Sequence, residues 1–470
     1  MNRTLNSQAS AFDAELVQRY DRPGPRYTSY PTAVAFGTFS EADYRACVRD
    51  SNEYPIPVPL SLYFHIPFCD TVCFYCACNK IATKDRSLAR TYLDYLAQEI
   101  RLQAGLFDAD RRVEQLHWGG GTPTFLDHEQ MRWLMQKTRE HFQLYGPEED
   151  AQADYSIEID PRSVSPDTIA LLRHIGFNRF SLGIQDVDAR VQRAVNRIQP
   201  LSQSRAIIDA CRSVDARSVS VDLIYGLPLQ TLAGFRQTLI AVADLGPDRI
   251  SVFNYAHMPE LFMPQRRIRV EELPAPALKL ELLQLAVEYL TGIGYQYIGM
   301  DHFARPGDEL ALAQKRGTLY RNFQGYTTHA DCDLIGMGVS AISSVENCYS
   351  QHVKSLEEYY FALDQGQLPV SRGIRLTADD GVRRAVIQQL SCHFMLDFRA
   401  IGRRFNLEFA TYFATELHQL ATMAQDGLLE LSDAGLQVTP QGRFLIRNIC
   451  MVFDLSLRSG QLKERFSRTV

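Results

Sequence analysis

Apolar and polar positions follow two alternating periods from about residue 60 to about residue 300. Short β-branched or aromatic runs are each followed by a longer amphipathic stretch, which is typical of a parallel sheet with crossover helices. The expected strands cover residues 62–66, 115–118, 155–159, 179–182, 219–224 and 250–253, with 297–300 as a seventh. An apolar stripe at helical spacing follows the first run and predicts a helix with Ser87 as its N-cap. The stripe consists of Ala89, Leu93, Leu96 and Ile100.

The segments on either side of this region have other patterns. The first 58 residues are rich in Pro and Tyr, which predicts an extended arm laid over the main domain. From about Thr377 the pattern predicts an amphipathic helix over 409–424, a hairpin over 426–438 and a final helix from about Gln441. This order is typical of a winged-helix-like module, and the modest Arg content favours a packing role over DNA binding. We expect an arm (1–58), a main domain with its extension (59–370) and a mainly helical domain (371–470).

Composition narrows the class of protein. The chain has 470 residues, more than one hydrophobic core usually serves. Its 46% hydrophobic and 22% charged residues are ordinary for a globular protein, and its net charge of -6 gives no general reason to expect nucleic acid. The N-terminus lacks the pattern of a secretory signal, and no apolar run is long enough to cross a bilayer. We therefore expect a cytoplasmic protein with no nucleic-acid or membrane partner.

Three cysteines form a compact motif directly after the first expected strand. Cys69, Cys73 and Cys76 have C-x3-C-x2-C spacing, and three thiolates on a four-iron cluster leave one iron open for another ligand. A structural zinc site is the alternative, with Cys78 or His65 as the fourth ligand. The single residue between Cys76 and Cys78 is too short for a usual zinc knuckle, so the spacing favours iron and sulfur. The other cysteines are expected to be inert core thiols: Cys47, Cys211, Cys332, Cys348, Cys392 and Cys450.

Polar residues follow almost every expected strand, where the loops of a parallel barrel form an active site. The second strand is followed by the glycine loop, which we define as residues 119–124 with the sequence GGGTPT. Glycines allow a ligand to approach the backbone and leave N–H groups free for a carboxylate or a ribose. We expect these loops to converge on one site. The other strand-end residues are His65, Glu158, Asp160, Gln185, Asp222, Asn254, Tyr255, Asp301 and His302.

The cysteine motif and the glycine loop together resemble the radical S-adenosylmethionine (SAM) superfamily. The motif reads Tyr63-x-His65-Ile66-Pro67-Phe68-Cys69-x3-Cys73-x-Tyr75-Cys76. Within the superfamily, the chain is similar along nearly its whole length to the oxygen-independent coproporphyrinogen III oxidases. It departs from their pattern at Tyr75, where phenylalanine is expected, and at Ala77, where glycine is expected. The similarity rests on residues 25–32 (PRYTSYPT), 76–80 (CACNK), 158–162 (EIDPR), 222–228 (DLIYGLP), 253–257 (FNYAH), 299–303 (GMDHF) and 321–326 (RNFQGY).

The resemblance implies a fold and a reaction. The fold is a partial (β/α)6 TIM-like radical SAM barrel with an N-terminal arm and a mainly helical, winged-helix-like C-terminal domain. Cys69, Cys73 and Cys76 are implied to hold one 4Fe-4S cluster, whose open iron takes the amino and carboxylate groups of SAM, while Cys78 lies nearby without ligating iron. A 5'-deoxyadenosyl radical then removes hydrogen from propionate side chains of coproporphyrinogen III. Two propionates become vinyl groups, which gives protoporphyrinogen IX in haem and porphyrin biosynthesis.

The resemblance also implies two neighbouring SAM sites. Strand-end carboxylates can accept hydrogen bonds from ribose or amino groups, and an arginine can clamp a carboxylate, although each alone is equally consistent with a cap or a salt bridge. The implied contacts to the first SAM are Tyr63, Gly120, Glu158 and Ile342. Those to the second are Tyr75, Gly121, Thr122, Gln185, Arg197, Asp222 and Ala256.

A substrate with four propionates needs cationic partners, and we expect the arm to close over it. The candidates in the matching segments and near them are Arg26, Lys80, Arg162, Arg267 and Arg321. The implied partners are coproporphyrinogen III, an unidentified reducing electron donor and a final electron acceptor, with a monomer expected.

Two alternatives stay open. A haem chaperone of the same superfamily typically has Cys-Asp-Phe after the third cysteine and lacks the arm motif, whereas this chain has Cys76-Ala77-Cys78 and Tyr27-Thr28-Ser29-Tyr30-Pro31. The other alternative is of a different class: a simple electron carrier, or a regulator that uses the C-terminal wing. A carrier would usually have a fourth cysteine ligand and no glycine loop.

Overall fold

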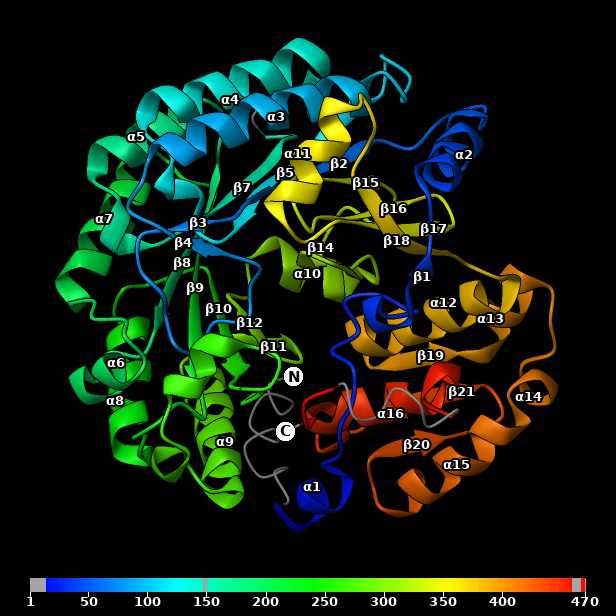
Figure 1. The fold of residues 1–470 in the computed structure, drawn as a ribbon. Helices are drawn as coiled ribbons and strands as arrows, with labels where there is room; N and C mark the ends of the chain where they lie inside the picture. The colour runs from blue at the N-terminus through cyan, green and yellow to red at the C-terminus, as the bar shows by residue number, and fades with distance from the viewer. Residues whose placement is uncertain (1–13, 147–148, 150, 459–465, 470) are drawn as a thin grey trace.

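The wall of an open barrel forms the centre of the protein (Figure 1). The computed structural model describes residues 14–146, 149, 151–458 and 466–469. Within them, parallel strands lie side by side in the order β15 (Asp333–Met337), β2 (Leu60–Ile66), β5 (Arg112–Gly120), β7 (Asp154–Ile159), β8 (Arg179–Gln185), β9 (Ser218–Tyr225) and β10 (Arg249–Asn254). Six of the predicted strands, all but the seventh, occur in this wall, so the predicted α/β barrel is confirmed.

Helices cover the outer face of the wall (Figure 1). Each of the six strands from β2 to β10 leads into at least one of them, as right-handed crossovers between parallel strands require. The predicted apolar stripe of the first helix is fully buried. In chain order the helices are α3 (Ser87–Ala104), α4 (His128–His141), α5 (Pro166–His174), α6 (Ala189–Ala194), α7 (Leu201–Ser213), α8 (Leu232–Ala243) and α9 (Pro276–Gly292).

Alternate residues of the strands face the helices and the inside of the barrel. In β9, Val219, Val221 and Leu223 are fully buried, whereas Ser220 and Asp222 between them are only half-buried. Successive side chains of a strand point to opposite faces, so the apolar set packs under the helices and the polar set enters the barrel. The polar residues at the strand ends therefore reach a common interior.

Antiparallel strands extend the sheet at both edges. Beyond β15 come β16 (Ile342–Val345), β17 (Cys348–His352), β18 (Val370–Arg375) and β1 (Gly37–Thr38). Beyond β10 come β12 (His302–Ala304) and β11 (Gln296–Gly299). Shorter elements complete this part of the chain: β3 (Phe68–Cys69), β4 (Ile81–Ala82), β6 (Gln143–Leu144), α10 (Glu309–Arg316), β13 (Tyr320–Asn322), β14 (Gly325–Thr327) and α11 (Leu356–Asp364).

Three local predictions were wrong. The seventh predicted strand corresponds to β11, but β11 pairs with β12 in a hairpin and not with β10, while β15, which the sequence analysis missed, pairs in parallel with β2. Ser87 is the first helical residue and not the N-cap, because the Asp85 carboxylate, a stronger acceptor than a hydroxyl, receives both its N–H and its hydroxyl. The helix expected over 409–424 is interrupted at Phe413.

The C-terminal part is mainly helical and contains the predicted hairpin. Strands β20 (Leu429–Leu431) and β21 (Gly435–Val438) form it, and β19 (Met395–Asp397) adds a third strand. The described segment ending at Val452 is helical after the hairpin, as predicted. The helices are α12 (Ala378–His393), α13 (Phe398–Phe405), α14 (Phe409–Tyr412), α15 (Ala414–Gln425) and α16 (Ile446–Val452).

The N-terminal arm is partly helical, not wholly extended. It contains α1 (Ala14–Tyr20) and α2 (Glu41–Asn52), the latter held by a capping box at Ser40. The linker between them runs along the C-terminal helices (Figure 1). There Arg447 donates to the carbonyls of Gly24 and Pro25. The arm thus joins the barrel to the C-terminal part; its residues 1–13 lie outside the described residues.

Two cysteines expected to be free thiols are paired. Cys47 in α2 and Cys348 in β17 form a disulfide, with Cα atoms 6.4 Å apart. They are 301 residues apart in the sequence, so only the fold brings them together. Cys211, Cys392 and Cys450 are buried free thiols, as predicted.

Candidate active site

The three motif cysteines line one cavity of about 240 Å³ at the C-terminal edge of the barrel strands. Cys69 ends β3, which pairs with β4, and Cys73 and Cys76 lie in the loop between these strands. Cys69 and Cys73 are each only 8% exposed. The loop therefore presents two buried thiols and one half-buried thiol, Cys76, to the cavity, an arrangement that can hold a metal cluster.

Positive charge surrounds these thiols. Arg162 and Arg197 each donate to the Cys73 sulfur at 3.6 Å, and Lys80 donates to the Cys76 carbonyl at 3.2 Å. Burial raises the pKa of Cys69 to about 11. The neighbouring cations offset the cost of holding thiolates in such a place.

Cys78 lies next to the motif but differs from its members. A hydrogen bond from the Cys78 thiol lowers the pKa of Cys76 to about 6, and the same contact raises the pKa of Cys78 well above its usual value. Such an interaction suits a group that supports a ligand without binding the metal itself.

The glycine loop begins with the last two residues of β5 and packs against the cysteine loop. A Cβ at Gly121 would lie 2.7 Å from the Pro67 carbonyl carbon and oxygen, and a Cβ at Gly120, where φ is +113°, would lie 2.7 Å from the His65 ring. The Gly121 N–H also donates to the Ile66 carbonyl at 2.8 Å. The expected approach of a ligand to these glycines stays a prediction; the structure adds a close approach by the chain itself at both positions. Their smallness fixes the cysteine loop against β5.

Glu158 is the best placed of the predicted contacts to the first SAM. It lines the cavity with Gly120, whose N–H donates to its carboxylate at 3.1 Å. His117 lies 3.5 Å from the other oxygen of this carboxylate, and Tyr63 stacks on His117 with ring centroids 5.8 Å apart. Ile342 is the first residue of β16, next to β15, and its side chain packs in the cluster of Phe36 and Tyr349.

Six of the seven predicted contacts to the second SAM line the cavity, and they come from different parts of the chain. Gln185 ends β8 with a φ of +69°, a strained value that is often kept at functional sites. Arg197 donates to the Gly183 carbonyl at 2.7 Å and to Asp160 at 3.1 Å. Buried polar atoms without a hydrogen-bond partner remain, namely Gln185 Oε1 and Arg197 Nε, and these can serve a ligand. The residues that line the cavity are Tyr75, Gly121, Thr122, Gln185, Arg197 and Asp222; Ala256 follows β10 and lines a different cavity.

Asp222 is unusual among the carboxylates of the cavity. Burial raises its pKa to about 6, with a smaller contribution from the charge of Glu158, while hydrogen bonds from Ser251 and Ser181 oppose the shift. Its carboxylate thus changes charge close to neutral pH, a common feature of binding and catalytic sites.

The five substrate candidates are not brought together. Lys80 and Arg162 line the cavity of the cysteines. Arg26 donates to the Asn254 carbonyl at the end of β10, and Arg267 lies over the Phe74 ring at 5.5 Å. Arg321 is 6% exposed and lies over Tyr326, with two guanidinium nitrogens that have no hydrogen-bond partner.

Two residues of the site have a function that the sequence did not indicate: Asp160, expected only as one of the strand-end polar residues, and Gly183, which was not singled out. Asp160 binds Arg162 at 2.6 Å and Arg197 at 3.1 Å, so it holds both arginines beside Cys73. The position of Asp160 directly after β7 is visible in the sequence, but its contact with Arg197, 37 residues later, is not. Gly183 is the other: a Cβ there would lie 2.7 Å from Gln185 and 3.0 Å from Arg197.

Comparison with known proteins agrees with this geometry. The radical SAM superfamily matches residues 63–241, and the HemN C-terminal domain matches residues 376–445. An oxygen-independent coproporphyrinogen III oxidase of Pseudomonas aeruginosa is 52% identical over 463 residues, which cover 98% of this chain and 99% of that protein. The chain belongs to the oxygen-independent coproporphyrinogen III oxidase family of radical SAM enzymes.

Further members of the family support the assignment along the whole length. The Escherichia coli K12 oxidase is 50% identical over 467 residues, covering 99% of this chain and all of that protein. The solved structure of E. coli coproporphyrinogen III oxidase (HemN) superimposes with a TM-score of 0.89 and covers 95% of this chain and 99% of that one. Membership in this family implies a 4Fe-4S cluster and SAM. Among the described residues, no helix is both long and apolar enough to span a membrane.

Proposed function

We propose that this protein catalyses the oxygen-independent oxidative decarboxylation of two propionate side chains of coproporphyrinogen III, giving protoporphyrinogen IX. The cluster and SAM, when bound, supply a 5'-deoxyadenosyl radical that abstracts hydrogen from the propionate. The observation that carries the proposal is that one cavity is lined by the three thiols, by Glu158 and by six of the seven expected contacts to the second SAM. The full-length similarity to the coproporphyrinogen III oxidases supports the choice of substrate.

In this proposal Cys69, Cys73 and Cys76 hold one 4Fe-4S cluster. The donor set fits the cluster because the three thiols line one cavity, two of them are buried, and two guanidinium groups lie within 3.6 Å of the Cys73 sulfur. Cys78 supports Cys76 through a hydrogen bond and binds no iron.

We further infer two SAM sites on the same cavity. Glu158, positioned by the Gly120 N–H and supported by Tyr63 through His117, accepts hydrogen bonds from the first SAM. Arg197 and Asp222 hold the second, since one offers a cation with an unpaired N–H and the other a buried carboxylate. The substrate then lies over the cavity, with Lys80 and Arg162 as the cations closest to it.

The arm, residues 1–58, is proposed to close over the substrate as a part distinct from the barrel and its extension (59–370) and from the C-terminal domain (371–470). Arg26 in the arm donates a hydrogen bond to the Asn254 carbonyl at the end of β10, and this contact brings the arm to the edge of the barrel. Cytoplasmic location and a monomeric state also remain part of this proposal.

The deciding experiment is anaerobic turnover by the reconstituted protein with coproporphyrinogen III, SAM and a chemical reductant. We expect protoporphyrinogen IX, and separate Ala substitutions of Cys69, Cys73 and Cys76 should abolish both iron binding and product. Cys211→Ala is the matched control because Cys211 is a buried free thiol in α7. A protein that binds iron and SAM but gives no product would contradict the activity and favour the haem chaperone.

The number of SAM sites is tested separately by equilibrium dialysis. Two SAM molecules per protein are expected, with one lost in Glu158→Gln and the other in Arg197→Met. A stoichiometry of one that neither substitution changes would contradict the two-site arrangement without affecting the proposed activity.

A further inference from the structure

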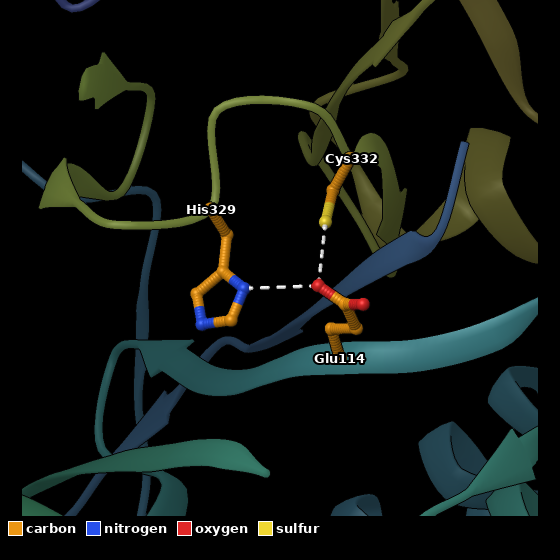
Figure 2. Close-up of side chains that lie close together, drawn as sticks. All are labelled: Glu114, His329 and Cys332. Carbon is orange, nitrogen blue, oxygen red and sulfur yellow. Dashed lines mark hydrogen bonds and ion pairs between the residues drawn. The ribbon is translucent and has the colours of Figure 1, made fainter. Parts of the chain in front are cut away.

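A second group of metal-binding side chains lies at the opposite edge of the barrel from the cysteine cavity. Glu114 is the third residue of β5, and His329 and Cys332 belong to the segment between β14 and β15 (Figure 2). The His329 Nδ1 atom is 3.2 Å from Glu114 Oε2, and the Cys332 sulfur is 4.0 Å from the same oxygen. All three donor atoms lie within 4.8 Å of one another.

We propose that Glu114, His329 and Cys332 form a binding site for a divalent zinc ion. A nitrogen, an oxygen and a sulfur donor together are the set that zinc prefers. Zinc bonds of about 2.0–2.3 Å in tetrahedral geometry place donor atoms roughly 3.3–3.7 Å apart. The two distances to Glu114 lie on either side of this range, so small side-chain rotations complete the site.

The surroundings of His329 supply an independent argument. Its other ring nitrogen, Nε2, is 3.5 Å from Asp154 Oδ2, and Arg179 holds that carboxylate through a 2.8 Å contact. Histidines that bind zinc usually donate their second ring N–H to a carboxylate, which fixes the tautomer and leaves the first nitrogen free for the metal. Asp154 is placed to accept the Nε2–H of His329, which leaves Nδ1 free to bind the metal.

A cavity adjoins two of the three side chains and can supply a fourth ligand. A small cavity of about 50 Å³ is lined by both His329 and Cys332, which is enough for a water molecule. The Cys332 thiol gives up its proton to become a zinc ligand, and the proton passes to solvent. Three protein ligands and one water would complete a tetrahedral site.

The position in the barrel indicates what the ion would do. Glu114 and Asp154 are at the N-terminal ends of β5 and β7, where residues of such barrels generally serve stability. A zinc ion would tie the segment before β15 to the neighbouring wall of the barrel. The site therefore adds stability and takes no part in the chemistry at the cysteine cavity.

Without the ion, the same side chains offer a competing arrangement. The nearby Asp154 and Glu114 carboxylates raise the pKa of His329 against the opposing effect of burial. A protonated His329 could thus bridge the two carboxylates as a simple ion pair. The two arrangements differ in zinc content and in the presence of a sulfur ligand.

Zinc content and zinc-edge X-ray absorption of the cluster-loaded protein test the proposal. After exposure to zinc and removal of the excess, we expect one zinc per protein with one sulfur and otherwise nitrogen and oxygen ligands. Cys332→Ser should remove the sulfur signal, and Glu114→Gln should weaken zinc binding at least about tenfold. Iron is invisible at the zinc edge, so the cluster does not interfere.

Cys78→Ser is the matched control, because Cys78 is a free thiol that could bind zinc near the cluster. We expect this variant to retain the sulfur-ligated zinc. Absence of bound zinc in the parent protein would overturn the proposal and leave the ion pair of His329. Loss of the sulfur signal in Cys78→Ser but not in Cys332→Ser would overturn it as well, even if a variant at Glu114 failed to fold.

Discussion

Gly121→Ala should damage the cysteine loop without touching a cysteine. The new methyl carbon would lie 2.7 Å from both the carbonyl carbon and the oxygen of Pro67, and 2.8 Å from the Phe68 oxygen, about 0.7 Å closer than ordinary contact at 3.4 Å. These neighbours are backbone atoms, so no side chain can rotate away. Overpacking of this kind costs about 1–3 kcal/mol.

The strain falls on the two residues that precede Cys69. Thr122, the residue after Gly121, donates to the Cys69 sulfur at 3.4 Å, and this contact should be lost when the two loops separate. We therefore expect a free energy of unfolding lower by about 1–3 kcal/mol and a lower iron content after reconstitution. Denaturant unfolding and iron analysis measure the two effects.

Gly292→Ala is the matched control, because a Cβ at that position, at the end of α9, meets nothing within 4 Å. This variant should keep the iron content and equal or exceed the parent in stability, since alanine favours a helix by roughly 0.5–1 kcal/mol. If Gly121→Ala matched Gly292→Ala in both stability and iron content, the reasoning about the glycine loop would be refuted.

Three further predictions concern single side chains. Cys78→Ala should keep the full iron content but hold the cluster less firmly against air, as followed by the decay of its visible absorption; complete loss of iron would show that Cys78 is a ligand. Asp222→Asn should raise the free energy of unfolding at neutral pH by up to about 3 kcal/mol, because the native pKa of about 6 exceeds the usual 3.8 and ionisation of Asp222 therefore costs stability above pH 6. This gain should fade as the pH drops from 6 toward 4. A difference in urea unfolding that does not depend on pH would contradict the prediction. Arg111→Met should lower the free energy of unfolding by about 3–5 kcal/mol in the same assay, because the buried Asp333 carboxylate loses the guanidinium that now lies 2.6 Å away. Arg90→Met is the control: it breaks an exposed pair with Asp94 and should lower the free energy of unfolding by less than about 1 kcal/mol.

The sequence was sufficient for the elements whose signal is local. The six parallel strands and the first helix followed from the period of their apolar residues, because a face buried under helices must be apolar along its length. Strand β15 was missed, although all five of its residues are buried, because Asp333–Met337 includes a glycine and lies between short strands with no amphipathic helix before it. Its partner is β2, more than 260 residues earlier, and pairing over such a distance leaves no periodic trace.

The cysteine site divides in the same way. The spacing of Cys69, Cys73 and Cys76 was visible in the sequence, since one loop carries all three. What the sequence could not show is the charge that surrounds them. Arg197 approaches Cys73 from 124 residues away, and Asp160 orients it only because β7 and β8 are neighbours.

The barrel separates two kinds of polar groups, and the separation explains why both can exist in one interior. At the C-terminal edge, Gln185 and Arg197 keep buried atoms without partners, a cost that a bound ligand can offset. At the N-terminal edge, Arg179 contacts both Asp154 and Glu309, so charge there is balanced within the protein. A substitution at the N-terminal edge should therefore change stability before it changes SAM binding, while one at the cavity should do the reverse. Glu114 and Glu158, on the neighbouring strands β5 and β7, offer the direct comparison: Glu114→Gln should lower the melting temperature of the zinc-loaded protein with SAM affinity kept, and Glu158→Gln should weaken SAM binding with the melting temperature nearly unchanged.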